Sequence, residues 1–169
     1  MTASRHRWHG RLFKCLPNTR PPRSKRATTA TKVTLMPDAR PGGAPTVVIV
    51  DRDRNVRDLV MFLLKPVGFE VEVVETGYLA LDRVRRLGRA IVITEIRVPE
   101  LDGLALCRLL KSDPALRTVV VVLSVQSAAD RARQSGADAF LLKPIDGVRL
   151  VSTILDVASK LATQCREST

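Results

Sequence analysis

The sequence of 169 residues has few cysteines and few aromatic side chains. Its three cysteines, Cys15, Cys107 and Cys165, are odd in number and far apart, and no two of them form a CxxC pair. This spacing fits neither a disulfide framework nor a cysteine-based metal site, and it suits a reducing compartment. Cys107 lies in an amphipathic segment, so we expect it to be a small core residue.

Long hydrophobic runs are also missing. No apolar stretch of the sequence approaches the ~20 residues that span a bilayer. Residues 1–35 lack the apolar central segment of a secretory signal. We therefore expect a cytoplasmic protein that does not insert into membranes.

Acidic residues are nearly absent from positions 1–45, where ten Lys and Arg stand against the single acid Asp38. Residues 46–169 hold eighteen Lys and Arg against sixteen acids, so most of the net charge of +11 belongs to the first segment. That segment is rich in Arg, Thr and Pro and has no sustained period, which predicts a basic, disordered extension. We expect a folded domain at 46–163 and a C-terminal tail at 164–169.

Two alternatives for the basic extension remain open. The natural protein could begin at Met36, with the preceding residues arising from a misplaced start. The extension could instead be an arm that contacts nucleic acid weakly, with Trp8 and Phe13 as stacking groups. No recognition-helix module accompanies it, so we do not expect specific reading of DNA.

After Pro45 the sequence alternates between apolar runs and amphipathic segments. The apolar runs, which predict strands, are 47–50, 70–75, 90–95, 119–123 and 139–143. The amphipathic segments, which predict helices, are 53–66, 78–87, 104–111, 127–134 and 148–161. This alternation indicates an α/β fold, a doubly wound five-stranded parallel sheet with helices on both faces.

Four polar residues stand at the ends of predicted strands: Asp51, Glu95, Ser124 and Lys143. Doubly wound sheets bind ligands beyond the carboxyl ends of their strands. We therefore expect the four side chains to converge at one edge of the sheet and to form the functional site.

The order of these residues, with Pro99, Asp102-Gly103 and Pro144, resembles the receiver domain of bacterial two-component response regulators over roughly residues 46–163. The resemblance implies a flavodoxin-like strand order, 2-1-3-4-5. It implies signalling partners such as a histidine kinase or a downstream effector. In that family an aspartate at the end of the third strand takes up a phosphoryl group, in a pocket where carboxylates hold Mg²⁺.

The resemblance also assigns a role to each residue of the pocket. The phosphoacceptor position and the acidic pair carry the family's chemistry, while a hydroxyl and a lysine receive the phosphoryl oxygens. The matching positions here are Glu95 for the phosphoacceptor, Asp51 and Arg52 for the acidic pair, Ser124 and Lys143 for the phosphate pocket, Phe140 for the switch aromatic, and Lys143-Pro144 for a cis peptide bond.

Two of these positions depart from the family pattern. Arg52 is a permanent cation that could grip Glu95 or Asp51 through two hydrogen bonds and then repel a divalent ion; alternatively it points to solvent. Asp51 and Glu95 remain as candidate metal ligands, so we expect Mg²⁺ binding to be weak or absent and no other cofactor. Glu95 is one methylene longer than aspartate, which displaces its carboxylate by roughly 1 Å and disfavours phosphoryl transfer.

Glu95 permits two interpretations. It could imitate a phosphorylated aspartate by reaching Lys143 and Ser124, or it could only seal the pocket structurally. Val125 stands where the family has a small residue, and its branched side chain would narrow the entrance. The span from Ser124 to Lys143 is short for the family, which predicts a trimmed fourth helix.

We therefore predict a stand-alone, non-enzymatic receiver domain that is not phosphorylated in the usual way and acts through protein–protein contacts. By resemblance, the docking surface would lie on residues 127–161. One alternative is a phosphatase of the haloacid-dehalogenase type with Asp51 as nucleophile and Asp53 as general acid/base, although no acidic strand end follows Lys143. Another alternative is a nucleic-acid-binding accessory protein that acts through residues 1–45.

Overall fold

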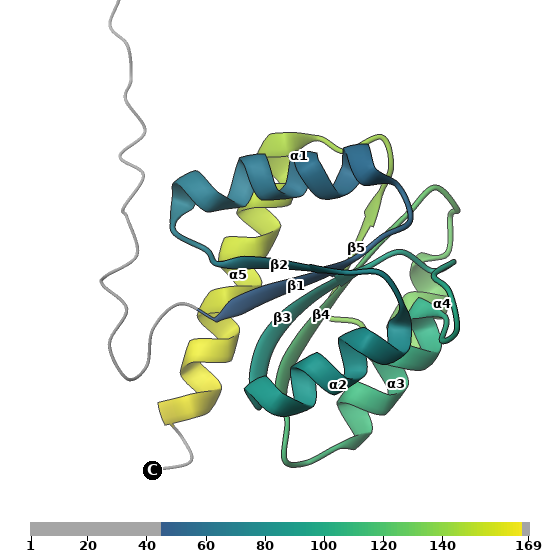
Figure 1. The fold of residues 1–169 in the computed structure, drawn as a ribbon. Helices are drawn as coiled ribbons and strands as arrows, with labels where there is room; N and C mark the ends of the chain where they lie inside the picture. Colours follow the sequence, from purple (N-terminus) through teal and green to yellow (C-terminus); the bar gives the residue numbers. More distant parts are fainter. Residues whose placement is uncertain (1–44, 167–169) are drawn as a thin grey trace, which may run out of the picture. The chain divides into compact units, whose positions relative to one another are not determined.

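The computed structural model describes residues 45–166, in which a five-stranded sheet carries helices on both faces (Figure 1). All strand pairs are parallel and the order is β2-β1-β3-β4-β5, which confirms the predicted fold class and strand order. In chain order the elements are β1 (Thr46–Val50), α1 (Arg54–Leu64), the 3-10 turn η1 (Lys65–Val67), β2 (Val71–Val74), α2 (Gly77–Leu87), β3 (Arg89–Thr94), α3 (Gly103–Ser112), β4 (Arg117–Ser124), α4 (Ala129–Gln134), β5 (Ala139–Leu142) and α5 (Gly147–Arg166).

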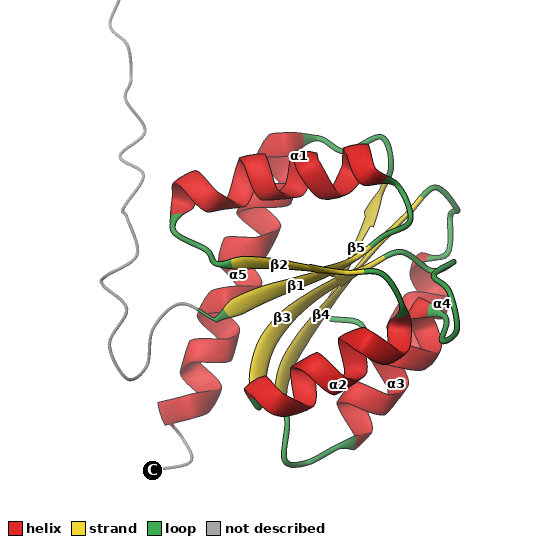
Figure 2. Cartoon of the chain, viewed as in Figure 1, coloured by secondary structure: helices red, strands yellow, loops and turns green. Residues whose placement is uncertain are grey.

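The sheet separates two apolar layers, because successive side chains of a strand point to opposite faces. On β1, Val47 and Ile49 pack with α1 and α5, and Val48 and Val50 pack with α2 and α3. Figure 2 shows the same arrangement, with α1 and α5 on one side of the strands and α2, α3 and α4 on the other. Burial on both faces explains why the central strands read as nearly continuous apolar runs.

Three helices begin at side chains that cap them. The carboxylates of Asp53 and Asp102 and the hydroxyl of Thr76 each accept a hydrogen bond from a backbone N–H in the first turn of α1, α3 and α2, respectively. Such caps satisfy N–H groups that have no partner within the helix. They fix where each helix starts relative to the strand before it.

Two elements differ in length from the prediction. The helix predicted to end at Leu161 continues to Arg166, because no glycine or proline follows Leu161 to end it. The fourth strand begins at Arg117, ahead of the predicted start at Val119. The short α4, Ala129–Gln134, agrees with the trimmed helix that the sequence predicted.

Two glycines allow the loop after β3 to lie close against its neighbours. A Cβ on Gly103 would overlap the backbone oxygen of Glu95, and a Cβ on Gly77 would overlap the backbone oxygen of Leu101. Both positions therefore require glycine. The loop between Glu95 and Gly103 is held beneath the carboxyl edge of the sheet by this close packing and by a hydrogen bond of 2.8 Å from the Gly103 N–H to the Ile96 oxygen.

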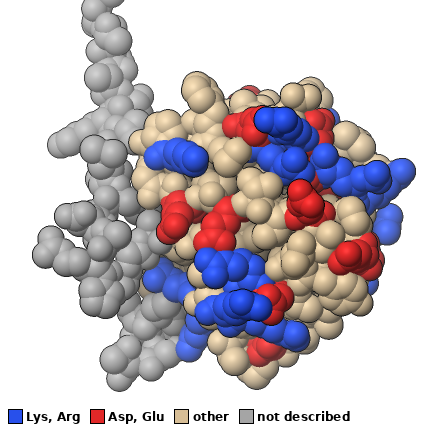
Figure 3. Space-filling view, viewed as in Figure 1, with Lys and Arg blue, Asp and Glu red and all other residues tan. Residues whose placement is uncertain are grey.

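Acidic and basic side chains are interspersed over the face of the described residues seen in Figure 3. This mixture agrees with the nearly balanced charge of residues 46–169. Across residues 45–166, none of the helices has the length and apolar character needed to cross a membrane. The predicted basic extension at 1–45 lies, except for Pro45, outside the described residues.

Candidate functional site

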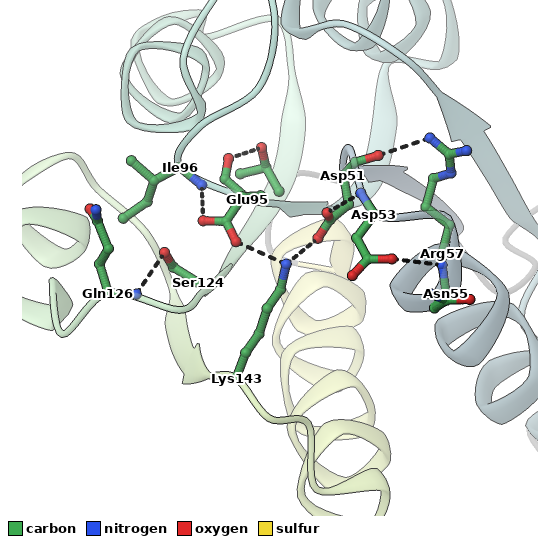
Figure 4. A network of polar contacts seen from close by, with 10 residues as sticks. Asp51, Asp53, Asn55, Arg57, Glu95, Ile96, Ser124, Gln126 and Lys143 are labelled. Atoms are coloured by element: carbon green, nitrogen blue, oxygen red, sulfur yellow. Dashed lines mark hydrogen bonds and ion pairs between the residues drawn. The ribbon is translucent and has the colours of Figure 1, made fainter.

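The four predicted strand-end residues come together at the carboxyl edge of the sheet (Figure 4). Asp51 directly follows β1, Glu95 directly follows β3, Ser124 ends β4 and Lys143 directly follows β5. Because β1, β3, β4 and β5 are adjacent and parallel, their carboxyl ends lie side by side. Sequence and topology together therefore place these side chains within reach of one another.

Lys143 links the two carboxylates of the site. Its Nζ lies 2.6 Å from Asp51 Oδ2 and 2.8 Å from Glu95 Oε2. The side chains of Lys143, Asp51 and Glu95 are only 11%, 3% and 10% exposed, respectively. Burial by itself lowers the pKa of Lys143, but its hydrogen bonds with Asp51 and Glu95 outweigh burial and raise that pKa. Lys143 is thus a protonated cation between the carboxyl groups of Asp51 and Glu95.

Glu95 is also held by its neighbours. Its Oε1 accepts a hydrogen bond of 2.7 Å from the Ile96 backbone N–H. Burial would raise the pKa of Glu95, but hydrogen bonds from Lys143, from the Ser124 hydroxyl and from that N–H lower it below its ordinary value. The carboxylate therefore stays ionised, with both oxygens engaged.

Asp51 is fixed from the α1 side of the site. Its Oδ1 accepts a hydrogen bond of 2.9 Å from the backbone N–H of Asp53, and its backbone oxygen accepts one of 3.0 Å from Arg57 Nη1. The carboxylate of Asp53 caps α1 through Asn55 and is exposed. Asp53 is therefore occupied as a helix cap, and nothing in this arrangement supports the phosphatase alternative.

Arg52 lies apart from these contacts. Its side chain is exposed and makes no hydrogen bond or ion pair with any other residue in the range 45–166. The structure thus matches the solvent-facing alternative, and Lys143 is the cation that contacts both carboxylates of the pocket. Arg52 nevertheless removes a carboxylate from the acidic pair that the family resemblance implies.

The residues present do not fit a Mg²⁺ site. Mg²⁺ prefers near-octahedral oxygen coordination and is usually held by carboxylates. Here the two available carboxylates, Asp51 and Glu95, share the ammonium group of Lys143. Within the described residues, no group of three or more His, Cys, Asp or Glu is arranged to hold a metal ion.

The remaining predicted residues border the site. Phe140 is half-buried and packs against the apolar cluster that contains Ile96, Leu104 and Val122. The peptide bond between Lys143 and Pro144 is cis. Val125 is 68% exposed. It lines a cavity of about 420 Å³ at the mouth of the site, together with residues of α1 and the loop after β5.

Sequence reasoning missed two contributors to the site. Arg57 lies one helical turn into α1 and bonds the Asp51 backbone, and the backbone N–H of Gln126 donates to the Ser124 hydroxyl at 3.2 Å. No pattern in the sequence marks either contact. A backbone N–H carries no residue signature, and an arginine in the first turns of a helix most often faces solvent.

Comparisons with known proteins agree with this geometry. The family model of the response regulator receiver domain matches residues 47–155. The gliding motility regulatory protein of Myxococcus xanthus is 33% identical over 114 residues, which are 65% of this chain and 15% of that protein. The polar-differentiation response regulator DivK of Brucella ovis is 30% identical over 112 residues, which are 64% of this chain and 90% of DivK.

A solved structure gives the same result. The signal receiver domain of a signal transduction histidine kinase from Syntrophus aciditrophicus superposes with a TM-score of 0.63 at 32% identity. The match covers 69% of this chain and 92% of that domain. The matched residues span only a small part of the Myxococcus protein, so the likeness concerns a domain.

Proposed function

This chain belongs to the response regulator receiver domain family of two-component signalling, and we propose that it signals through protein contacts without being phosphorylated in the usual way. Its partners on this proposal are signalling proteins such as a histidine kinase or a downstream effector. The surface formed by α4, β5 and α5 is the docking surface by family resemblance. The widely spaced cysteines support a cytoplasmic location.

The observation that carries this proposal is the position of Lys143 between Asp51 and Glu95. The lysine that would receive phosphoryl oxygens is already bonded to both carboxylates, at 2.6 and 2.8 Å. The carboxylate of Glu95, at the phosphoacceptor position, also accepts a hydrogen bond from the Ile96 backbone N–H. A phosphoryl group on Glu95 would have to displace these contacts at a pocket that does not fit Mg²⁺, which normally neutralises the transferred charge.

The contacts of Glu95 support its imitation of a phosphorylated aspartate, since they reach Lys143 and Ser124. The imitation is partial, because a glutamate carries one negative charge where a phosphoryl group carries about two. Structural sealing of the pocket is the alternative.

A Glu95→Gln variant keeps the shape of the side chain and removes its charge. Imitation predicts amide shift changes in nuclear magnetic resonance spectra that spread through β4, α4 and β5, whereas sealing predicts changes confined to the pocket.

The proposal is tested by intact-mass spectrometry after incubation with acetyl phosphate and Mg²⁺. Four proteins are compared: the natural chain, the single variants Arg52→Asp and Glu95→Asp, and the double variant that carries both changes. The double variant restores the carboxylates that the family uses, so it is the positive control. We expect a gain of one phosphoryl mass in the double variant and none in the natural chain.

Three results would contradict the proposal or the roles that it gives to Arg52 and Glu95. A phosphoryl mass on the natural chain would show that Glu95, or another residue, accepts the group despite the Lys143 contacts. Phosphorylation of Arg52→Asp alone would show that a missing metal ligand, rather than Glu95, limits the reaction. If the double variant also stays unmodified while remaining folded, the scaffold itself has lost the reaction, and the specific roles given to Arg52 and Glu95 are wrong.

A further inference from the structure

A second cavity, of about 560 Å³, lies away from the pocket, between the loop after β3 and the helices α3 and α4. Arg97 from the loop, Arg108 from α3 and Arg131 from α4 line it. Neither Asp51 nor Lys143, two of the strand-end residues of the pocket, lines this cavity. Three arginines from three separate segments therefore converge on one concavity outside the pocket.

Among residues 45–166 these three arginines have no acidic partner, whereas five other arginines pair with an aspartate or a glutamate. Arg83 pairs with Glu72 and Arg86 with Asp82, but no ion pair joins Arg97, Arg108 or Arg131 to any acid among residues 45–166. Like charges that are not paired with acids repel one another, so a bound anion would relieve this repulsion. The charges are therefore available to a ligand.

Two of the guanidinium groups are oriented by neutral partners. Arg108 Nη1 donates a hydrogen bond of 3.1 Å to the hydroxyl of the buried Ser135 at the end of α4. When the Gln126 amide is turned so that its oxygen faces Arg97, it accepts hydrogen bonds from that guanidinium. Each contact uses part of a guanidinium fork and leaves other N–H groups free to donate.

Asp102 is the acid that lines the cavity, and it is already engaged. Its Oδ1 accepts hydrogen bonds of 3.0 Å from the backbone N–H groups of Leu104 and Ala105, which makes it the cap of α3. With three arginines and one acid, the lining has a net positive charge. The electrostatics of the cavity therefore favour an anion.

The bottom of the cavity is apolar. The buried side chains of Ile96, Val98 and Leu104 contribute to its lining. Guanidinium groups match the oxygens of phosphate through paired hydrogen bonds, and cavities of about 300–1,000 Å³ hold small organic ligands. From this combination of cationic rim, apolar floor and size, we infer that the cavity binds a small organic phosphate, with the phosphate on the arginines and the organic part on the apolar residues.

This site is independent of the chemistry at Glu95, and the inference stands whether or not Glu95 is phosphorylated. The two sites are nevertheless joined by one residue. Ile96 lines the cavity, and its backbone N–H donates to Glu95 Oε1 at 2.7 Å. A ligand at the cavity therefore contacts a residue that positions the Glu95 carboxylate.

The test is titration of the full chain with adenosine 5′-monophosphate, adenosine and inorganic phosphate, followed by amide shifts in nuclear magnetic resonance spectra and by calorimetry. We expect the nucleotide to bind more tightly than either of its parts and to shift the amides of Leu104 and Ser135. Arg108→Gln and Arg131→Gln should each weaken binding by about tenfold, the loss typical of one charge-assisted contact.

The matched control is Arg86→Gln, which removes the same charge from an exposed position on α2. It should leave binding of the nucleotide unchanged. Equal weakening by all three substitutions would mean non-specific attraction to a basic chain, including residues 1–45, and would overturn the inference. No binding at millimolar nucleotide, or binding of adenosine as tight as that of the nucleotide, would overturn it as well.

Discussion

Asp51 and Glu95 are buried acids at adjacent strand ends, where each would be destabilised without a nearby cation. The structure supplies that cation from β5, through the Nζ of Lys143. A buried ion pair adds little stability over an apolar replacement, but removing one partner leaves an uncompensated charge behind. Here the loss of Lys143 would leave two such charges facing each other.

We predict that Lys143→Met destabilises the domain by about 3–5 kcal/mol, the range for breaking a buried ion pair. Urea unfolding followed by circular dichroism measures the change. Lys160→Met, at an exposed position on α5, is the control and should change the free energy of unfolding by less than about 0.5 kcal/mol. Adding Glu95→Gln to Lys143→Met should recover part of the loss, because one orphaned charge disappears. A loss for Lys143→Met no larger than that of the control would refute the prediction.

The pocket also predicts how stability depends on pH. Glu95 has a folded-state pKa below its ordinary value of 4.5, so its contribution is present above that value and is lost as pH falls through the lowered folded pKa. Lys143 has a folded-state pKa above 10.5, so its contribution is present below 10.5 and is lost as pH rises through the raised pKa. We expect Glu95→Gln to flatten the acid side of a plot of unfolding free energy against pH. An unchanged acid side would show that Glu95 is not held as described.

The convergence of Asp51, Glu95, Ser124 and Lys143 could be predicted from the sequence, since strand ends of a parallel sheet meet at one edge. The direction of Arg52 could not. Arg52 lies in the loop between β1 and α1. In a loop, neither the alternation of a strand nor the period of a helix predicts the direction of a side chain. The lysine contact depends on the register of β5 against β4, which a single sequence does not reveal.

At the scale of elements, the loop between β3 and α3 depends on glycine. The backbone of Gly103 lies against the oxygen of Glu95 and the hydroxyl of Thr94, so a side chain there would push the loop away from the strand end. Because this loop carries Ile96, which bonds Glu95, the position of the carboxylate depends on the close approach.

We predict that Gly103→Ala destabilises the domain by about 1–3 kcal/mol, as overpacking of a tight contact does. Gly147→Ala is the matched control, since a Cβ there would meet only the flexible end of Leu63 at 3.3 Å. Thermal unfolding of both variants measures the difference. Equal melting temperatures for the two variants would show that the loop adjusts without strain.

Apolar periodicity predicted the order and type of the helices and strands. The predicted boundaries were wrong where tertiary packing, rather than the local sequence, determines the end of an element. The end of α5 could not be set from apolar spacing, since Ala162 and its successors neither favour burial nor break a helix. On the edge strand β2, Glu72 accepts hydrogen bonds from Arg83 of α2 at 2.5 and 2.6 Å, while Val73 is 37% exposed. An edge strand such as β2 pairs with a single neighbouring strand, so the alternation of apolar and polar residues does not determine which of its side chains are exposed.

For the molecule as a whole, charge is distributed very unevenly along the chain. Residues 1–35 carry nine Lys and Arg and no acid, while the acids and bases of residues 46–169 nearly balance. Attraction to a polyanion falls steeply with salt when it depends on such a cluster of cations.

We predict that the full chain binds DNA weakly and without sequence preference at low salt, and that deletion of residues 1–35 abolishes this binding. Fluorescence anisotropy with two labelled duplexes of different sequence, across a series of salt concentrations, measures it. Binding that persists in the deletion variant, or that favours one duplex, would place the contact within the folded domain and contradict the prediction.

The contacts of Lys143 with Asp51 and Glu95 affect how long a signal from this domain would last. A phosphoryl group on a carboxylate is added by a transfer reaction and removed by hydrolysis, so the rate of hydrolysis limits the duration of the signal. An ammonium held between Asp51 and Glu95 is made by folding and lasts as long as the fold. On the proposed function, the duration of such a signal is set by how fast the protein is made and degraded, and its strength by the number of copies.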